Sequence, residues 1–315
     1  MLDVRRLRVL REVASHGSFS AAAEALSYTQ SAVSQQIAAL EREAGAQLVE
    51  RSARGIKLTD PGRALVAHAD AILARLADAE EELLAINGLR GGRLRIAAFP
   101  SACAALIPQA VATFRDRHPG VELSLTPAEP PEGLALLRAG DVDVALAIEA
   151  TGAPARTDSA DLDALTLLDD PMYIMLPRDH PLAASSRLKL ADLADEEWMI
   201  GSGRTTCPDT SIFLRACQAA GFEPRMAFNL DDYNAIQGFV AAGMGISFIP
   251  DLALINLRDD LVIRSFGGGR PPVRRIVAVT LSDSYRSPAK QAMLDVLVEV
   301  SGAFGERRTE LALVS

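Results

Sequence analysis

The chain has 315 residues, of which 49% are hydrophobic and 23% charged, and this ordinary globular composition excludes a wholly disordered protein. Its formal net charge of −9 argues against a generally basic, nucleic-acid-binding coat. Three cysteines are too few for a disulfide scaffold, the first residues lack the apolar core of a secretory signal, and no apolar run approaches the length of a membrane span. We therefore expect a cytoplasmic protein of two or three domains with no membrane partner.

The charge is unevenly distributed along the chain. Residues 1–58 carry eight basic and six acidic side chains, whereas the other 257 residues carry 24 basic and 35 acidic ones. A mildly basic head on an acidic body indicates that a polyanionic partner meets the head.

The first 58 residues predict three helices and a hairpin. Helical spacing of apolar residues predicts a helix that Gly17 ends, a short Ala-rich helix at 21–26, and a longer helix from Ser31 that Gly45 ends. Two short segments that flank residues 52–55 then predict a small hairpin, or wing.

Residues 59–90 predict one long helix with a regular apolar seam. The seam residues are spaced alternately by four and three, which averages 3.5 residues and is the period of a coiled coil. They are Leu65, Ala69, Ile72, Leu76, Ala79, Leu83 and Ile86. Pairing with a second copy of the chain is our first interpretation, and packing of this helix against its own domain is the alternative.

Residues 91–304 alternate between strand-like and helical segments, which predicts parallel sheets in an α/β fold. Two such series in about 210 residues indicate two lobes, and we expect the tail at 305–315 to fray. The expected strands are 94–99, 121–126, 142–148, 173–177, 198–200, 226–230, 245–250 and 274–281. The expected helices are 103–117, 131–139, 207–220, 232–242 and one from about 288.

The segment at 19–51 carries a specific motif. A Phe-Ser-x-Ala-Ala-x-x-Leu element at 19–26, a tight turn and a second helix with small polar residues at its start form a helix-turn-helix arrangement. With Leu40-Glu41 and the residues from Leu48 to Arg51, this segment closely resembles the N-terminal domain of LysR-type transcriptional regulators. The resemblance extends over most of the chain through Leu58-Thr59-x-x-Gly62, Arg93-Leu94-Arg95-Ile96, Gly140-Asp141-Val142-Asp143 and Gly243-Met244-Gly245-Ile246.

The resemblance implies a domain plan. Residues 1–58 form a helix-dominated winged helix-turn-helix domain, and residues 59–90 form a linker and dimerisation helix. Residues 91–304 form an effector-binding domain like the two-lobed periplasmic binding proteins, with lobe I at about 93–168 plus 270–304 and lobe II at about 169–269. The implied partners are double-stranded DNA, a small-molecule effector, a second copy of the chain in a homodimer and then a homotetramer, and RNA polymerase if the protein is an activator.

The start of the second motif helix is where side chains reach the edges of bases, and Gln and Ser both hydrogen-bond to them. The resemblance adds that wing cations contact phosphates or enter the minor groove. The DNA-binding candidates are therefore Gln30, Ser31, Ser34, Gln35, Arg51 and Arg54. Ser31 stands where the family often has Pro, and we expect it to cap the helix. The alternatives are a solvated helix face for the polar residues and an internal salt bridge for Arg51.

The cleft between such lobes collects the carboxyl ends of strands and the N-termini of helices, and free N–H groups there suit an anionic effector. The effector-binding candidates lie at these ends: Ser101, Cys103, Pro130, Arg204, Thr205 and Phe248. The alternative roles are helix caps for Ser101 and Thr205, a core position for Phe248, and plain exposure for Arg204.

Two other functions remain open at this stage. Cys207 and Cys217 fall near the paired cysteines of peroxide-sensing members of the family, so a thiol switch within the same family is one alternative. A cytoplasmic solute-binding protein is the other, although it leaves the head unexplained. We expect neither an enzyme nor a cofactor, because no Gly-x-Ser-x-Gly, phosphate-loop or Cys-x-x-Cys motif occurs, and the four scattered histidines predict no metal site.

Overall fold

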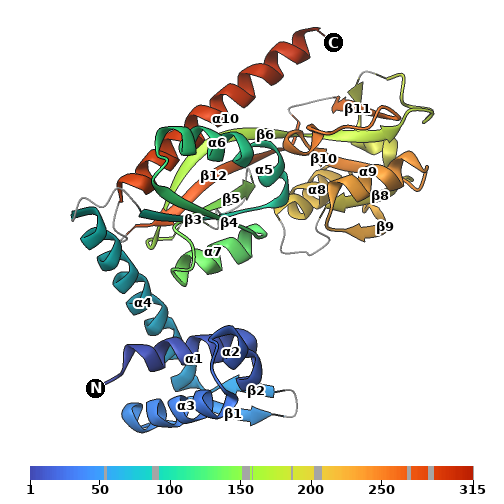
Figure 1. The fold of residues 1–315 in the computed structure, drawn as a ribbon. Helices are drawn as coiled ribbons and strands as arrows, with labels where there is room; N and C mark the ends of the chain where they lie inside the picture. Colours follow the sequence, from blue (N-terminus) through green and yellow to red (C-terminus); the bar gives the residue numbers. More distant parts are fainter. Residues whose placement is uncertain are drawn as a thin grey trace. The chain divides into compact units, whose positions relative to one another are not determined.

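The chain divides into two compact units in a computed structural model. Unit 1 is Met1–Ile86 with Arg138–Asp141, and unit 2 is Asn87–Leu137 with Val142–Ser315. Figure 1 labels their helices and strands. The structure describes residues 1–52, 55–86, 92–150, 157, 159–185, 187–201, 208–267, 271–282 and 287–314.

Three helices and a hairpin form the first part of unit 1, as the sequence predicts. They are α1 (Val4–His16), α2 (Phe19–Ala25), α3 (Gln30–Ala44), β1 (Val49–Ser52) and β2 (Gly55–Leu58), with the two strands antiparallel. Gly17 and Gly45 end α1 and α3 with φ of 61° and 64°, a left-handed conformation that favours glycine. One face of each helix is buried in a common core that includes Leu10, Val13 and Ile37.

The start of α3 differs from the expectation by one residue. Thr29, in an extended conformation, caps the helix, and its Oγ1 accepts from the N–H of Ala32 at 3.2 Å. Ser31 is already helical, so it cannot be the cap, and its hydroxyl lies 3.0 Å from that of Thr29.

A single long helix, α4 (Asp60–Ile86), follows the hairpin. The Thr59 Oγ1 accepts from the N–H of Gly62 at 3.1 Å and donates to the carbonyl of Gln47 at 2.6 Å. A Cβ on Gly62 would collide with the backbone of Leu48, so only glycine lets the helix start this close to the hairpin. These contacts explain physically why Thr and Gly stand three residues apart at this junction.

Lobe I of unit 2 is a sheet with helices on both faces (Figure 1). Its strands are β3 (Gly92–Ala98), β4 (Val121–Pro127), β5 (Val144–Ala150) and β12 (Val273–Leu281), in the order β4-β3-β5-β12. Its helices are α5 (Pro100–Ala105), α6 (Ile107–Arg117), α7 (Pro130–Arg138) and α10 (Pro288–Val314). Alternate strand residues pack on opposite faces: Ile96 and Leu146 against α5, α6 and α10, and Ala97 and Ala145 against α7.

Lobe II repeats this layered plan with three parallel strands and two helices. The strands are β8 (Glu197–Gly201), β10 (Ile246–Pro250) and β9 (Arg225–Leu230), and the helices are α8 (Pro208–Ala219) and α9 (Tyr233–Ala241). Trp198 and Ile200 of β8 pack in one cluster with Phe213 of α8, whereas Met199 of β8 packs in another with Ile236 of α9. The other elements of this lobe are β7 (Arg187–Leu188), β11 (Leu261–Phe266) and two short 3-10 helices, η1 (Leu190–Leu193) and η2 (Asp251–Leu254).

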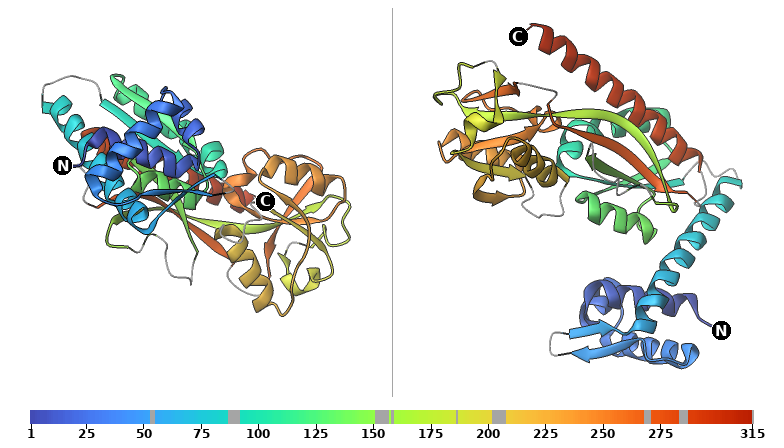
Figure 2. Two further views of the ribbon diagram at one scale, coloured as in Figure 1. Left: turned by 90° about the horizontal axis from the view of Figure 1, so that it is seen from below. Right: turned by 180° about the vertical axis from the view of Figure 1, so that it is seen from behind.

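One strand is shared by the two lobes. β6 (Leu162–Pro177) is 16 residues long, pairs with β12 as far as Pro171, and pairs with β10 from Met172 onward. Figure 2 shows this strand in yellow-green from behind the molecule. All its pairings are antiparallel, as is that of β12 with β5. The prediction of parallel sheets is therefore confirmed for β4-β3-β5 and β10-β8-β9 and wrong for β6 and β12. Strands that pass between lobes need no helical crossover, which is why they can run antiparallel here.

The described residues depart from the sequence expectations at further places, and the single helix expected at 103–117 is two helices, α5 and α6. The first half of β6 and all of β11 were not predicted, and in β6 the charged residues Asp163, Asp169 and Asp170 obscure the strand pattern. α10 continues to Val314, across the tail that we expected to fray, and the segment from Gly305 contains good helix formers and no proline. Among the described helices, none is both long enough and apolar enough to cross a membrane.

Candidate functional site

The N-terminal part of α3 presents polar side chains to solvent. Gln30, Ser31 and Gln35 are exposed and Ser34 is half-buried, while the buried face of the helix carries Val33, Ile37 and Leu40. Ala22 and Ala23 of α2 are buried beneath α3, and their small side chains allow a close crossing of the two helices. The amide and hydroxyl groups on this face can both donate and accept hydrogen bonds, which is the chemistry that base edges require.

The hairpin is fixed to the helices by partly buried polar contacts. Glu41 of α3 accepts from the N–H groups of Leu48 and Val49 at 2.9 and 3.3 Å. The N–H of Ile56 in β2 donates to the carbonyl of Gly17 at 2.9 Å. The sequence also predicts that Arg51 and Arg54 of the hairpin contact DNA. Arg54 and the side chain of Arg51 lie outside the described residues.

A buried ion cluster joins the two lobes of unit 2. Arg274 of β12 is 1% exposed, and its guanidinium lies 2.6 Å from Asp170 of β6 and 2.8 Å from Asp209 of α8. The same guanidinium donates to the Ser101 hydroxyl of α5 at 2.7 Å and lies 5.3 Å from the centre of the Phe99 ring. Arg274 and Asp170 are directly opposite each other in the β12–β6 register, so the sheet itself brings the two charges together.

The burial of this cluster determines its protonation. Desolvation acts to lower the pKa of Arg274, but the negative charges of Asp209 and Asp170 outweigh it and raise the pKa, so the guanidinium stays charged. Desolvation raises the pKa of the Asp170 carboxyl, and the charge of Arg274 offsets only part of that shift. Asp170 also accepts from the N–H of Leu252 at 3.1 Å. The cluster therefore depends on its single cation.

A small cavity opens between the lobes beside this cluster. Its volume is about 10 Å³, close to what one water molecule needs. The Tyr233 hydroxyl donates to Asp209 at 2.8 Å, and the bare Cα of Gly201 leaves room for the Tyr233 ring, which a Cβ would meet at 2.8 Å. The cavity is lined by Phe99, Pro100, Ser101, Glu129, Ile148, Gly201, Asp209, Asp231, Tyr233 and Arg274.

Only part of the nominated effector set reaches this cavity among the described residues. Ser101 lines it, whereas Cys103 is half-buried in α5 and its thiol donates to the Ala98 carbonyl at 3.3 Å. Pro130 is buried as the first residue of α7, where a missing N–H costs nothing. Phe248 is 2% exposed and packs against Phe213, so the structure assigns it to the core of lobe II rather than to a ligand. Two further nominees, Arg204 and Thr205, lie outside the described residues.

The charged residues of the cavity were missed by sequence reasoning. Asp231 follows β9 directly and Glu129 lies two residues after β4, and such positions are a usable signal for a residue at a strand's carboxyl end. Arg274 and Asp170 lie within strands, where the pattern alone predicts an edge position rather than a buried pair. Their pairing becomes visible only when the register of β6 and β12 is known.

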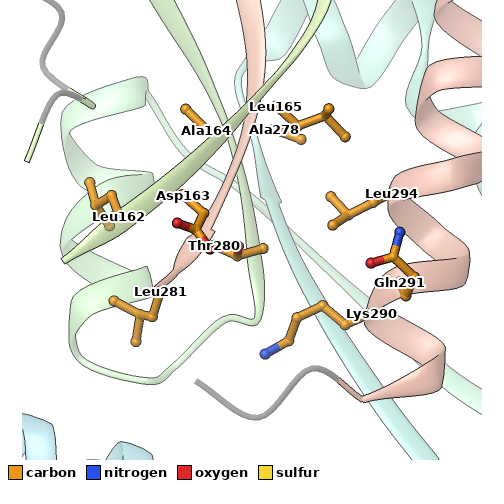
Figure 3. Close-up of a pocket in the computed structure, with 10 residues that line it drawn as sticks. All are labelled: Leu162, Asp163, Ala164, Leu165, Ala278, Thr280, Leu281, Lys290, Gln291 and Leu294. Carbon is orange, nitrogen blue, oxygen red and sulfur yellow. The ribbon is translucent and has the colours of Figure 1, made fainter. Parts of the chain in front are cut away.

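A second, larger cavity lies within lobe I. It has a volume of about 430 Å³ and lies between β6, β12 and the first turns of α10 (Figure 3). Leucines form much of its wall, and the buried Lys290 contributes a cation. Its full lining is Leu162, Asp163, Ala164, Leu165, Ala278, Thr280, Leu281, Lys290, Gln291 and Leu294.

The described cysteines are not activated thiols. Burial raises the pKa of Cys217 to about 12, and its side chain is fully buried in the core of lobe II. Burial also raises the pKa of Cys103. The third cysteine, Cys207, lies outside the described residues. A thiol switch that uses Cys207 and Cys217 therefore stays a prediction from the sequence.

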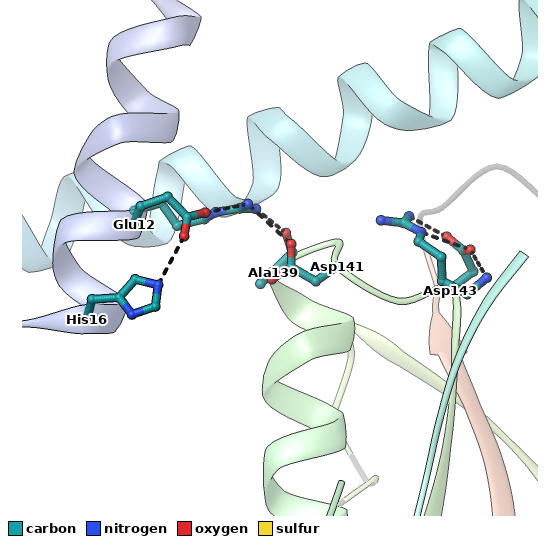
Figure 4. A network of polar contacts seen from close by, with 7 residues as sticks. Glu12, His16, Ala139, Asp141 and Asp143 are labelled. Atoms are coloured by element: carbon teal, nitrogen blue, oxygen red, sulfur yellow. Dashed lines mark hydrogen bonds and ion pairs between the residues drawn. The ribbon is translucent and has the colours of Figure 1, made fainter. Parts of the chain in front are cut away.

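Other charged residues have structural partners. Asp143 accepts from the backbone N–H and the guanidinium of Arg95, at 2.7 and 2.6 Å, and so ties β5 to β3 (Figure 4). The Nε2 of His16 lies 3.6 Å from the carboxylate of Glu12, one turn away on α1. Within the described part of the chain, no cluster of three His, Cys, Asp or Glu side chains has a geometry that would hold a metal ion.

Comparison with known proteins is consistent across sequence and structure. Residues 4–63 match the family model described as "Bacterial regulatory helix-turn-helix protein, lysR family", and residues 87–302 match "LysR substrate binding domain". The chain is 31% identical over 298 residues to the probable HTH-type transcriptional regulator LrrA of Synechococcus elongatus, covering 94% of this chain and 96% of that protein. It is 34% identical to a probable hydrogen peroxide-inducible genes activator of Mycobacterium avium, covering 95% and 92%. The full-length CbnR structure, solved with its target DNA, has the same fold at 23% identity, with a TM-score of 0.63 and coverage of 95% and 100%.

Proposed function

The chain belongs to the LysR family of transcriptional regulators, and we propose that it reads its operator through the exposed polar face at the start of α3. Family membership establishes a DNA-binding helix-turn-helix and an effector-binding domain in one regulator. The named relatives are transcriptional regulators, and we propose that this chain acts likewise in the cytoplasm, without catalysis.

The observation that carries the proposal is the arrangement of α3. Its capped N-terminus presents Gln30, Ser31 and Gln35 to solvent, while Val33 and Ile37 hold the opposite face in the core. Gln pairs well with adenine, and Ser accepts from or donates to several base edges. Ser34 is half-buried beside them and completes the proposed reading face, which Arg51 and Arg54 of the hairpin would extend onto the phosphates.

We propose that α4 pairs with α4 of a second copy. Leu65 and Ala69, early in the seam, pack on the core of unit 1. Ile72, Leu76 and Leu83, later in the seam, are 42%, 46% and 61% exposed in one chain. A second helix with the same 3.5-residue seam would cover them. The family's oligomers support a dimer, and a dimer of dimers that contacts RNA polymerase in activation is the further assembly that we propose.

We propose that the effector binds between the lobes of unit 2. Ser101 and Arg274 of lobe I and Asp209 and Tyr233 of lobe II meet there, so a ligand at this place changes contacts in both lobes at once. Effector binding would shift the population of assemblies and so the spacing that the heads present to DNA. This plan keeps residues 1–58, 59–90 and 91–304 as the proposed head, linker and regulatory domain.

The thiol-switch alternative is a second function within the same family. The similarity to a probable hydrogen peroxide-inducible genes activator of Mycobacterium avium favours a thiol switch. The buried thiol of Cys217, whose pKa is raised, argues against it. Loss of operator binding on mild peroxide treatment, restored by thiol reductant, would support the switch.

A gel-shift titration with the DNA directly upstream of the chain's own gene tests the proposed reading face. We expect specific binding that weakens steeply with salt, because phosphate contacts release counterions. Gln35→Ala should weaken that binding by about five- to 150-fold, on the order of 1–3 kcal/mol, without changing the oligomer mass. Gln109→Ala, an exposed glutamine on α6, is the matched control and should bind as the parent does. Equal affinities of Gln35→Ala and the parent would contradict the assignment of α3.

A further inference from the structure

The four residues Arg138–Asp141 belong to unit 1, although the chain on both sides of them belongs to unit 2. Their neighbours Leu137 and Val142 are buried in the core of lobe I. The chain therefore leaves lobe I at the end of α7, contributes four residues to the unit of α1 and α4, and returns to lobe I before β5. We call Arg138–Asp141 the docking segment.

Arg11 of α1 holds the docking segment by two polar contacts. Its guanidinium donates to the carbonyl of Ala139 at 3.0 Å and lies 3.2 Å from the carboxylate of Asp141 (Figure 4). The same guanidinium lies 3.1 Å from Glu12, so its own helix also orients it. The Arg11 side chain is only 17% exposed, and a hydrogen bond from a charged donor is roughly twice as strong as one between neutral groups.

A close packing contact accompanies these polar contacts. Gly140 has a φ of 71°, and a Cβ on it would lie 2.9 Å from the Cβ of Ala74 on α4. The backbone of the docking segment therefore lies directly against α4, at a point where both partners carry the smallest side chains.

Arg11 also acts on a carboxylate of α4. Burial raises the pKa of Asp70, the positive charge of Arg11 lowers it, and the negative charge of Asp141 raises it. These three charged groups are therefore close enough to influence one another. One guanidinium of α1 thus interacts with α4 and with the docking segment at the same time.

One helix connects the docking segment to the cavity between the lobes. Glu129, which lines that cavity, directly precedes α7, and Arg138 is both the last residue of α7 and the first of the docking segment. The helix has nine residues and is therefore about 14 Å long. Leu134 and Leu137 bury one of its faces in lobe I. A rigid helix of this kind can carry a displacement from one of its ends to the other.

We propose that α7 and the docking segment form a clasp, through which the state of the effector site reaches the DNA-binding head of the same chain. Effector binding between the lobes displaces the start of α7, and the helix passes this displacement to the segment that Arg11 holds. Because α1 shares one core with α2 and α3, a change at the clasp acts on the reading helix. This inference rests on the proposed function and adds the physical route that couples its two sites.

Limited trypsin digestion of the full-length chain tests the clasp, because the bond after Arg138 lies inside the docking segment. A protease needs this segment to open, so its release should accelerate the cleavage. Ala74→Leu places a larger side chain where Gly140 packs, while leucine keeps α4 helical. We expect fragments that end at Arg138, identified by mass spectrometry, to form about tenfold faster in Ala74→Leu and in Arg11→Met.

Each variant has a matched control on its own helix. Ala71 is exposed on α4, and Arg8 is exposed on α1. Ala71→Leu and Arg8→Met should therefore be cleaved after Arg138 at the rate of the parent. Ala74→Leu changes no charge, so it decides the result if Arg11→Met loses cooperative thermal unfolding.

The link to the head is tested with the DNA directly upstream of the chain's own gene. Coupling is reciprocal, so DNA that alters the clasp must be bound with an affinity that the clasp alters. We expect this DNA to change the cleavage after Arg138 by fivefold or more in the parent but not in Ala74→Leu, and the affinity of Ala74→Leu for it to differ by fivefold or more from that of the parent. A duplex of scrambled sequence is the control.

Each contrary result has a distinct meaning. Cleavage after Arg138 that neither variant accelerates would overturn the clasp. Faster cleavage with an unchanged DNA affinity would overturn the transmission to the head. A DNA effect on cleavage that persists in Ala74→Leu would be direct shielding and would also count against the transmission. If the parent gives no gel shift, the proposed reading of DNA fails together with the transmission, whereas the cleavage rates still decide the clasp.

Discussion

Replacing Arg274 with methionine should destabilise unit 2 severely. The change removes the guanidinium that contacts Asp170, Asp209 and Ser101, and it leaves Asp170 fully buried without a cation. Removing one partner of a buried ion pair costs about 3–5 kcal/mol, because the remaining charge keeps its desolvation penalty. Methionine keeps an apolar stem as far as the position of the arginine Nε, so the guanidinium is the main group lost.

The assay can use the chain's own fluorescence. Trp198 is the single tryptophan and is fully buried in lobe II, so urea unfolding followed by its emission reports on this lobe. Arg275→Met is a closely matched control, because Arg275 is the next residue on β12 and pairs at 2.9 Å with Asp169 in a half-exposed position. Such a surface pair contributes about 0–1 kcal/mol.

The loss should depend on pH in a defined direction. Burial already raises the pKa of Asp170, and without the charge of Arg274 nothing in that pair opposes the shift. The folded variant then takes up a proton at a higher pH than the unfolded chain, so its stability rises as the pH falls. We expect the deficit of Arg274→Met to be smaller at pH 5 than at pH 8. Equal deficits for Arg274→Met and Arg275→Met, at either pH, would refute the assignment of the buried cluster as the link between lobes.

Two further results follow from other parts of the chain. Gly62→Ala should destabilise unit 1 by about 2 kcal/mol or more in thermal unfolding, because its Cβ would collide with the backbone of Leu48, just before β1. Gly302→Ala is the control: its Cβ would meet open space, so stability should change by no more than about 1 kcal/mol. Leu76→Lys with Leu83→Lys should weaken the proposed dimer by about a hundredfold or more in sedimentation velocity, and an unchanged mass would exclude α4 as the interface.

Local signals in the sequence were sufficient for the head and for much of the regulatory domain. Gly17 and Gly45 end helices because each adopts a left-handed conformation that other residues disfavour, and the alternation along 94–99 and 142–148 follows from two-faced burial of strands. The motif at 19–51 identified the family because its spacing reflects a close helix crossing at Ala22 and Ala23. These features depend on neighbours within a few residues, so the sequence by itself determined them.

The regulatory site was decided by contacts between distant segments. Arg274 and Asp170 are 104 residues apart in the chain, and Ser101 is a further 69 residues before Asp170. Their meeting depends on the register of β12 with β6 and on the passage of β6 from one lobe to the other. No local pattern encodes a register between strands this far apart. The sequence therefore determined the family, the helices of the head and the seam of α4, whereas the tertiary structure alone placed the acidic cavity and its buried cation, because both arise from long-range pairing.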